Sequence, residues 1–102
     1  MATKAVKLYI EQNKVVVFSK TWCPYCAQAK KTLGDFKIDF TAVELDNLKN
    51  EREMQDALLE VSGQRTVPNI YIGQKHIGGN SDLQALKSSG QLETLLKEVD
   101  AL

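Results

Sequence analysis

The sequence predicts an α/β fold in which a four-stranded mixed sheet carries helices on both of its faces. Two features of the 102 residues predict it. Segments with the apolar spacing of helices alternate with short β-branched and aromatic segments that have the composition of strands. The last two strand-like segments are separated only by Gly73 and Gln74, which indicates an antiparallel hairpin after a parallel first pair. The expected order is α-β-α-β-α-β-β-α-α within a single domain, residues 1–102.

The first third of the chain predicts a helix, a central strand and a second helix. Residues 4–12 place apolar side chains at helical spacing. Residues 15–19 are β-branched and aromatic, and their apolar side chains would face both sides, which favours a central strand covered by helices. Pro24 occupies a first-turn position where helices tolerate proline, and good helix formers follow as far as Leu33. Gly34 is predicted to end this helix.

A second strand and a third helix are expected next. Residues 40–45 show the alternation of a strand. Asn50 is followed three residues later by Glu53, the pattern of a capping box at the start of a helix. Apolar side chains then recur at helical spacing as far as Val61, and Gly63 is predicted to end the helix.

The final third predicts a hairpin and two helices. The two strand segments are separated by a two-residue turn, and the two helical segments are separated near Gly90. The expected elements are strands 68–72 and 75–77, a helix that Ser81 caps and that carries Leu83 and Leu86, and a helix that carries Leu92, Leu95, Leu96 and Val99.

Charge and hydropathy argue against several classes of function. Thirteen basic residues balance thirteen acidic ones, whereas nucleic-acid and membrane-surface proteins usually carry a basic excess. No segment approaches the roughly 18 consecutive apolar residues of a transmembrane helix, and residues 1–5 lack the apolar core of a signal peptide. We therefore expect a cytoplasmic protein. In that compartment a close cysteine pair is more often catalytic than structural.

The cysteines of the chain, Cys23 and Cys26, lie between the expected central strand and the helix that follows it. If Cys23 is the N-cap, its sulfur lies beside the unpaired N–H groups of the first helical turn. The helix dipole and the nearby Lys20 add positive charge, and such surroundings lower a cysteine pKa from about 8.5. Cys23 is then the attacking thiolate of disulfide exchange. Cys26, one turn later and more buried, is expected to stay a thiol until it resolves a mixed disulfide.

Two other interpretations of the cysteine pair remain open from the residues alone. The pair could be half of a structural zinc site, but such a site needs four ligands and the chain adds only a distant histidine, His76. His76 is instead expected to be an exposed strand residue. The pair could also be two inert buried cysteines. Redox chemistry is favoured over both because of the strand–helix junction and the neighbouring lysine.

Three motifs together resemble one protein family over essentially the whole chain. They are Lys20-Thr21-Trp22-Cys23-Pro24-Tyr25-Cys26, Thr66-Val67-Pro68 and Gly78-Gly79-Asn80-Ser81-Asp82-Leu83. With these motifs the sequence resembles the dithiol glutaredoxins. The resemblance implies a thioredoxin-like fold and glutathione-dependent reduction of disulfides, especially protein–glutathione mixed disulfides. It also implies a monomer, glutathione as co-substrate, glutathionylated or disulfide-bonded proteins as partners, and no metal.

The resemblance also implies roles for individual residues. Cys23 matches the nucleophile and Cys26 the resolving thiol. The Val67–Pro68 bond matches a cis peptide whose backbone pairs with the cysteine of glutathione. The glutathione-binding positions carried over are Lys20, Gln55 and Arg65 for the glycyl carboxylate, Gly79, Ser81 and Asp82 for the γ-glutamyl end, and Tyr25, Thr66, Val67 and Pro68 along the groove between them.

Each of these assignments has a plainer alternative. Pro68 could simply begin an edge strand, and Ser81 with Asp82 could be only a helix cap and a first-turn acid. The cationic and amide positions could be solvated surface residues.

Two departures from the family are visible: Trp22, for which we expect a partly exposed ring and no new chemistry, and Asn80, which replaces a cysteine of many relatives. Without that third thiol, oxidative dimerisation through this position is not expected.

Three rival functions also remain. A thioredoxin-type reductase supplied by NADPH would lack a glutathione loop. An iron–sulfur carrier would be a dimer bridged by a cluster at Cys23, which Pro24 disfavours in the family. A glutathione-dependent regulator would show no turnover.

Overall fold

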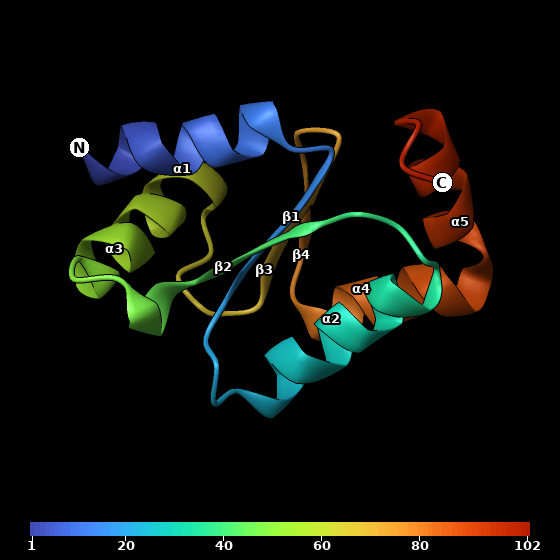
Figure 1. The fold of residues 1–102 in the computed structure, drawn as a ribbon, viewed down its shortest axis with the longest axis horizontal. Coiled ribbons are helices and arrows are strands. Elements are labelled where there is room, and N and C mark those ends of the chain that lie inside the picture. The colour runs from blue at the N-terminus through green and yellow to red at the C-terminus, as the bar shows by residue number, and fades with distance from the viewer.

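The computed structural model describes residues 1–102, in which a four-stranded sheet lies between two layers of helices (Figure 1). The predicted fold class and element order are confirmed. The elements are α1 Ala2–Gln12, β1 Val15–Ser19, α2 Pro24–Asp35, β2 Thr41–Glu44, the short 3-10 turn η1 Leu45–Asn47, α3 Glu51–Ser62, β3 Asn69–Ile72, β4 Lys75–Gly78, α4 Asn80–Ser89 and α5 Gln91–Glu98.

The order of the strands brings several loops to one edge of the sheet. The order is β2-β1-β3-β4, with β1 parallel to β2 and antiparallel to β3, and β3 antiparallel to β4. The carboxyl ends of β1, β2 and β4 therefore lie at the same edge as the start of β3. The register agrees: Ser19 pairs with Glu44 and Phe18 with Asn69. The segments that follow β1, β2 and β4 thus meet the segment that precedes β3.

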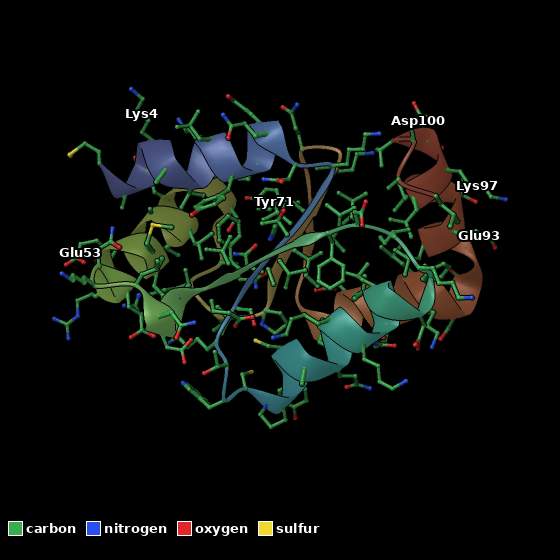
Figure 2. The ribbon with its side chains drawn as sticks, viewed as in Figure 1. Lys4, Glu53, Tyr71, Glu93, Lys97 and Asp100 are labelled. Carbon is green, nitrogen blue, oxygen red and sulfur yellow. The ribbon has the colours of Figure 1, made fainter.

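The central strand divides the core between the two faces of the sheet. Val16 and Phe18 pack with α1 and α3, whereas Val15 and Val17 pack with α2, α4 and α5. This alternation confirms a central strand covered on both sides. Figure 2 shows the side chains that fill these two layers, with Tyr71 lying in the layer beneath α1, while the charged Lys97 points away from the protein.

The predicted end of α2 at Gly34 is wrong. The helix continues to Asp35, and the left-handed conformation that usually stops a helix occurs at Lys37 (φ 58°). The N–H of Lys37 donates to the carbonyl of Gly34 at 2.9 Å. Gly34 is thus the last residue but one of the helix, and its backbone does not adopt the left-handed conformation for which glycine is favoured at a helix end. The predicted ends at Gly63 and Gly90 are confirmed.

Two predicted helix starts also need correction. Ser81 does not cap α4; Gly79 is the N-cap, and its N–H donates to the carboxylate of Asp82 at 3.0 Å. Asp82, the third residue of the helix, accepts this bond, whereas a serine at the N-cap would instead accept from an N–H of the first turn. Asn50 is the N-cap of α3, but its side chain makes no capping hydrogen bond, so the predicted capping box with Glu53 does not form.

The strands agree with the sequence more closely than the helix ends do. The predicted strand 40–45 is shorter, because η1 begins at Leu45. In the hairpin, Gly73 and Gln74 both have positive φ, 57° and 67°, as a two-residue turn of type I′ requires.

None of the helices combines the length and the apolar character needed to cross a bilayer.

Candidate active site

The two cysteines lie where β1 ends and α2 begins. Cys23 is the N-cap residue of α2, with extended backbone (φ −86°, ψ 119°), and Pro24 begins the helix, as predicted. Cys26 follows one turn later, so both side chains lie on the same side of α2. Cys23 is 8% exposed, Cys26 is fully buried, and both thiols are free. Cys23 is therefore the thiol that a substrate can reach.

The surroundings of the two sulfurs separate their pKa values. Burial raises the pKa of Cys23, but the backbone N–H and thiol of Cys26, the N–H of Tyr25 and the charge of Lys20 together lower it below its usual range. The Cys23 sulfur makes no hydrogen bond that caps α2, so the N–H groups act on it as nearby partial positive charges. Burial and the neighbouring sulfur of Cys23 raise the pKa of Cys26. The site therefore favours ionisation of Cys23 before that of Cys26.

Lys20 also lowers the pKa of Cys23, and its ammonium has other partners. Its Nζ lies 3.2 Å from the Glu51 carboxylate and 3.1 Å from Oε1 of Gln55. It also lies 5.6 Å from the centroid of the exposed Trp22 ring. The Glu51 carboxylate offsets part of this ammonium charge, which weakens its field.

The loop before Cys23 is fixed by Asp46, a residue that the sequence analysis missed. The N–H of Thr21 donates to Oδ1 of Asp46 at 3.0 Å, and the Thr21 hydroxyl donates to Oδ2. The hydroxyl and the N–H both lower the pKa of Asp46. Asp46 lies in η1, directly after the strand that pairs in parallel with β1. The predicted parallel pairing was therefore the signal that could have located it.

A pocket of about 400 Å³ opens beside the dithiol, where α2, the segment before β3 and the start of α4 meet. The Val67–Pro68 peptide bond on its wall is cis, as expected. The start of α4 is the second helix N-terminus at this edge, and its first N–H groups have no partner within the helix. The pocket is lined by Tyr25, Thr66, Val67, Pro68, Gly79, Asn80 and Ser81. Asn80 alone among these was not predicted as a binding residue.

The other predicted binding residues lie outside this pocket. Lys20 and Gln55 are in contact, and Nε2 of Gln55 donates to the backbone carbonyl of Arg65 at 3.3 Å. The guanidinium of Arg65 instead pairs with Asp56, at 3.1 Å. The carboxylate of Asp82 accepts the N–H at the start of α4. The structure therefore groups Lys20 with Gln55 and turns the charged end of Arg65 away from them.

Metal ligands do not gather at the dithiol. Nowhere do three or more His, Cys, Asp or Glu side chains lie close enough together to hold a metal ion. His76 is exposed on β4, with its ring centroid 5.1 Å from that of Tyr71. This donor set does not fit the four-ligand zinc site that the sequence left open.

A free dithiol with a thiolate-favouring sulfur at a helix start, and a buried thiol one turn behind it, defines the class of protein. On this sheet it is a thiol–disulfide oxidoreductase with a thioredoxin-like fold.

Comparison with known proteins narrows the class to a family. The sequence model of the family described as glutaredoxin matches residues 15–77. A glutaredoxin from Ricinus communis is 49% identical over 102 residues and covers 100% of both chains. Glutaredoxin-1 from Saccharomyces cerevisiae is 49% identical over 100 residues, covering 94% of this chain and 91% of the yeast one. A crystal structure of a buckwheat glutaredoxin–glutathione complex matches with a TM-score of 0.97 and 39% identity, over 100% of this chain and 93% of that chain. The chain belongs to the glutaredoxin family.

Proposed function

We propose that this glutaredoxin uses glutathione to reduce protein–glutathione mixed disulfides, and also protein disulfides, through Cys23 and Cys26. The observation that carries the proposal is the pocket beside the low-pKa thiol. The pocket extends from Tyr25, two residues after the nucleophile, to a helix start whose N–H groups suit a carboxylate, and glutathione carries a thiol between two carboxylates. A related buckwheat protein has been crystallised with glutathione.

In the first reaction the Cys23 thiolate attacks the glutathionyl sulfur of a mixed disulfide. The Cys23–glutathione bond forms as the substrate disulfide breaks, and the protein sulfur leaves as a thiolate and takes a proton from solvent. A second glutathione, as its thiolate, then attacks the glutathionyl sulfur on Cys23. Glutathione disulfide leaves, and the Cys23 thiolate is restored.

Protein disulfides need the second cysteine. Attack by Cys23 releases one protein thiol and leaves the protein bound through a mixed disulfide. Cys26 then loses its proton and attacks Cys23, which releases the second protein thiol and forms the Cys23–Cys26 disulfide. Two glutathione molecules reduce that disulfide. The thiol of Cys26, buried beneath Cys23, is protected from competing reactions until this step.

The proposed pose places the γ-glutamyl carboxylate at the start of α4, near Gly79 and Ser81, with Asp82 available to the ammonium group. The cysteine portion lies along Thr66, Val67 and Pro68, where backbone groups can pair with it as an added strand would. Tyr25 borders this groove on the side of α2. The glycyl carboxylate is assigned to Lys20 and Gln55, and to Arg65 if its guanidinium leaves Asp56.

Two serine variants test the mechanism. We expect Cys23→Ser to abolish glutathione-coupled reduction of a glutathionylated peptide, because no other reactive thiolate remains. We expect Cys26→Ser to keep this activity and to lose the reduction of protein disulfides. Near-wild-type turnover by Cys23→Ser would contradict the assignment. Efficient reduction through NADPH and a reductase, with weak reduction by glutathione, would favour the thioredoxin-type rival.

We further propose that residues 1–102 act as one domain, as a monomer in the cytoplasm, passing electrons from glutathione to protein disulfides. Both core clusters pack on the same sheet, which supports one folding unit. Light scattering of the reduced and oxidised protein tests the monomer.

A further inference from the structure

Two hydrogen-bonded contacts connect α2 directly to α4, the two helices that lie side by side on one face of the sheet (Figure 1). Nδ2 of Asn80 donates to Oε1 of Gln28 at 2.8 Å, and Nε2 of Gln84 donates to Oγ1 of Thr32 at 2.8 Å. Nε2 of Gln84 also donates to Oδ1 of Asn80 at 3.1 Å, which joins the two contacts. We call these four side chains the amide ladder.

The spacing of the amide ladder defines how the two helices are aligned. Gln28 and Thr32 are four residues apart on α2, and Asn80 and Gln84 are four apart on α4. Each contact therefore lies about one helical turn from the other on both helices. The helices therefore run in the same direction, and Asn80, the first residue of α4, lies beside Gln28, the fifth residue of α2. A slip of one turn would move the start of α4 by about 5.4 Å relative to the start of α2.

Two of the four side chains of the amide ladder are buried, which disfavours such a slip. Asn80 is 9% exposed and Thr32 is 4% exposed. A different alignment would leave these polar groups without partners in a region of low dielectric, which costs more than the bond itself contributes. The sheet is a less direct connection, because β1, which leads to α2, and β4, which leads to α4, are separated by β3.

Both N-termini carry groups of the active site. Cys23 is the N-cap of α2, and Gly79, at the start of α4, lines the pocket beside it. The alignment therefore determines how far the reactive sulfur lies from the N–H groups that can bind a carboxylate. In glutathione one isopeptide bond and a flexible glutamyl side chain join the sulfur to the γ-glutamyl carboxylate, so their separation has a fixed maximum.

We propose that the amide ladder is the specificity-determining device of this site: it matches the sulfur-to-carboxylate distance of γ-glutamyl thiols and so selects them over thiols that lack the γ-glutamyl group. Asn80 is its central positioning residue, since it contacts one side chain on each helix. This inference rests on the proposed function.

The test compares two substrates that differ only in the γ-glutamyl group. A peptide thiol is prepared as its mixed disulfide with glutathione and, separately, with cysteinylglycine. Gln28→Met and Gln84→Met each remove one polar end of the amide ladder while keeping the side-chain length. Gln91→Met, on the exposed start of α5, is the matched control.

We expect kcat/KM for the glutathione disulfide to fall about tenfold in both amide-ladder variants, mainly because KM rises. Misplacing a substrate by ~1 Å can cost about a hundredfold in rate, and the expected loss lies within that limit. In these variants the turnover of the cysteinylglycine disulfide and the pH midpoint of Cys23 alkylation should stay unchanged. Gln91→Met should change neither quantity. Gln28 is exposed, so its variant should fold even if Gln84→Met does not.

Equal losses on both substrates, or no loss on either, would overturn the inference while leaving the proposed function intact. A wild-type protein with no preference for the glutathione disulfide would remove the proposed function, and the inference with it.

Discussion

At the scale of single residues, the acidity of Cys23 depends mainly on groups of its own helix. The N–H and thiol of Cys26 and the N–H of Tyr25 outrank Lys20 among the effects that lower its pKa. The ammonium of Lys20 carries a full charge, but it forms an ion pair with the carboxylate of Glu51. The nearby dipoles belong to the first turn of α2 and have no partner in that helix, so nothing offsets them.

This ranking predicts the outcome of two substitutions. Cys26→Ala removes a thiol that lowers the pKa of Cys23, and Lys20→Gln removes the ammonium charge. Both changes should raise the pH midpoint of Cys23 alkylation by iodoacetamide, and Cys26→Ala should raise it more. Mass spectrometry identifies the alkylated cysteine in each case. Cys26→Ser, which keeps a donor, should lie nearer to wild type than Cys26→Ala does. A larger rise in Lys20→Gln than in Cys26→Ala would show that the ammonium is the main cause.

At the scale of elements, two glycines with opposite surroundings test how helices begin and end here. Gly78 precedes α4 with φ 118°, and a Cβ at this position would overlap the carboxylate of Asp82. That carboxylate caps α4. Gly34 lies inside α2, and a Cβ there would meet open space.

Alanine at these two positions should therefore change stability in opposite directions. Gly78→Ala should lower the free energy of unfolding by about 1–3 kcal/mol, because it forces a strained backbone and displaces a cap. Gly34→Ala should raise it by about 0.5–1 kcal/mol, since alanine favours a helix interior more than glycine does. Urea unfolding of the reduced protein measures both. A destabilised Gly34→Ala would mean that Gly34 does end the helix in solution.

The same elements show what the sequence could and could not predict. The strands and the cysteine-bearing helix start follow from local patterns, such as the apolar run of β1 and proline after Cys23. The end of α2 was missed because glycine permits a left-handed conformation without requiring it, and Lys37 adopts it instead. Asp46 and the amide ladder were missed because they depend on which segments become neighbours. Polar residues four apart on two helices, Gln28 with Thr32 and Asn80 with Gln84, were the available signal.

At the scale of the whole molecule, the reactive thiols couple the charge state of the site to the stability of the fold. The folded protein lowers the pKa of Cys23 and raises that of Cys26, whereas both are near 8.5 in an unfolded chain. A lowered pKa means that the unfolded state binds more protons between the two values, so stability rises with pH in that window. The contribution of Cys23 is full above about 8.5 and is lost as pH falls through its folded value.

Cys26 acts in the opposite direction at higher pH. Its folded pKa is raised, so its contribution is full below the unfolded value of about 8.5 and is lost as pH rises through the folded one. The two cysteines therefore have separate pH windows. Below about pH 8.5 only the contribution of Cys23 changes with pH.

Reduced wild-type protein should therefore gain stability relative to reduced Cys23→Ser as the pH rises toward about 8.5, because only wild type can form the stabilised thiolate. Urea unfolding at each pH, with the same reductant for both proteins, gives the difference, in which the titrating groups away from the cysteine pair cancel. The oxidised wild-type protein is a second control, since a Cys23–Cys26 disulfide has no proton to lose and its stability should not follow the same rise. A difference that stays constant or shrinks over this range would mean that the fold does not stabilise the Cys23 thiolate.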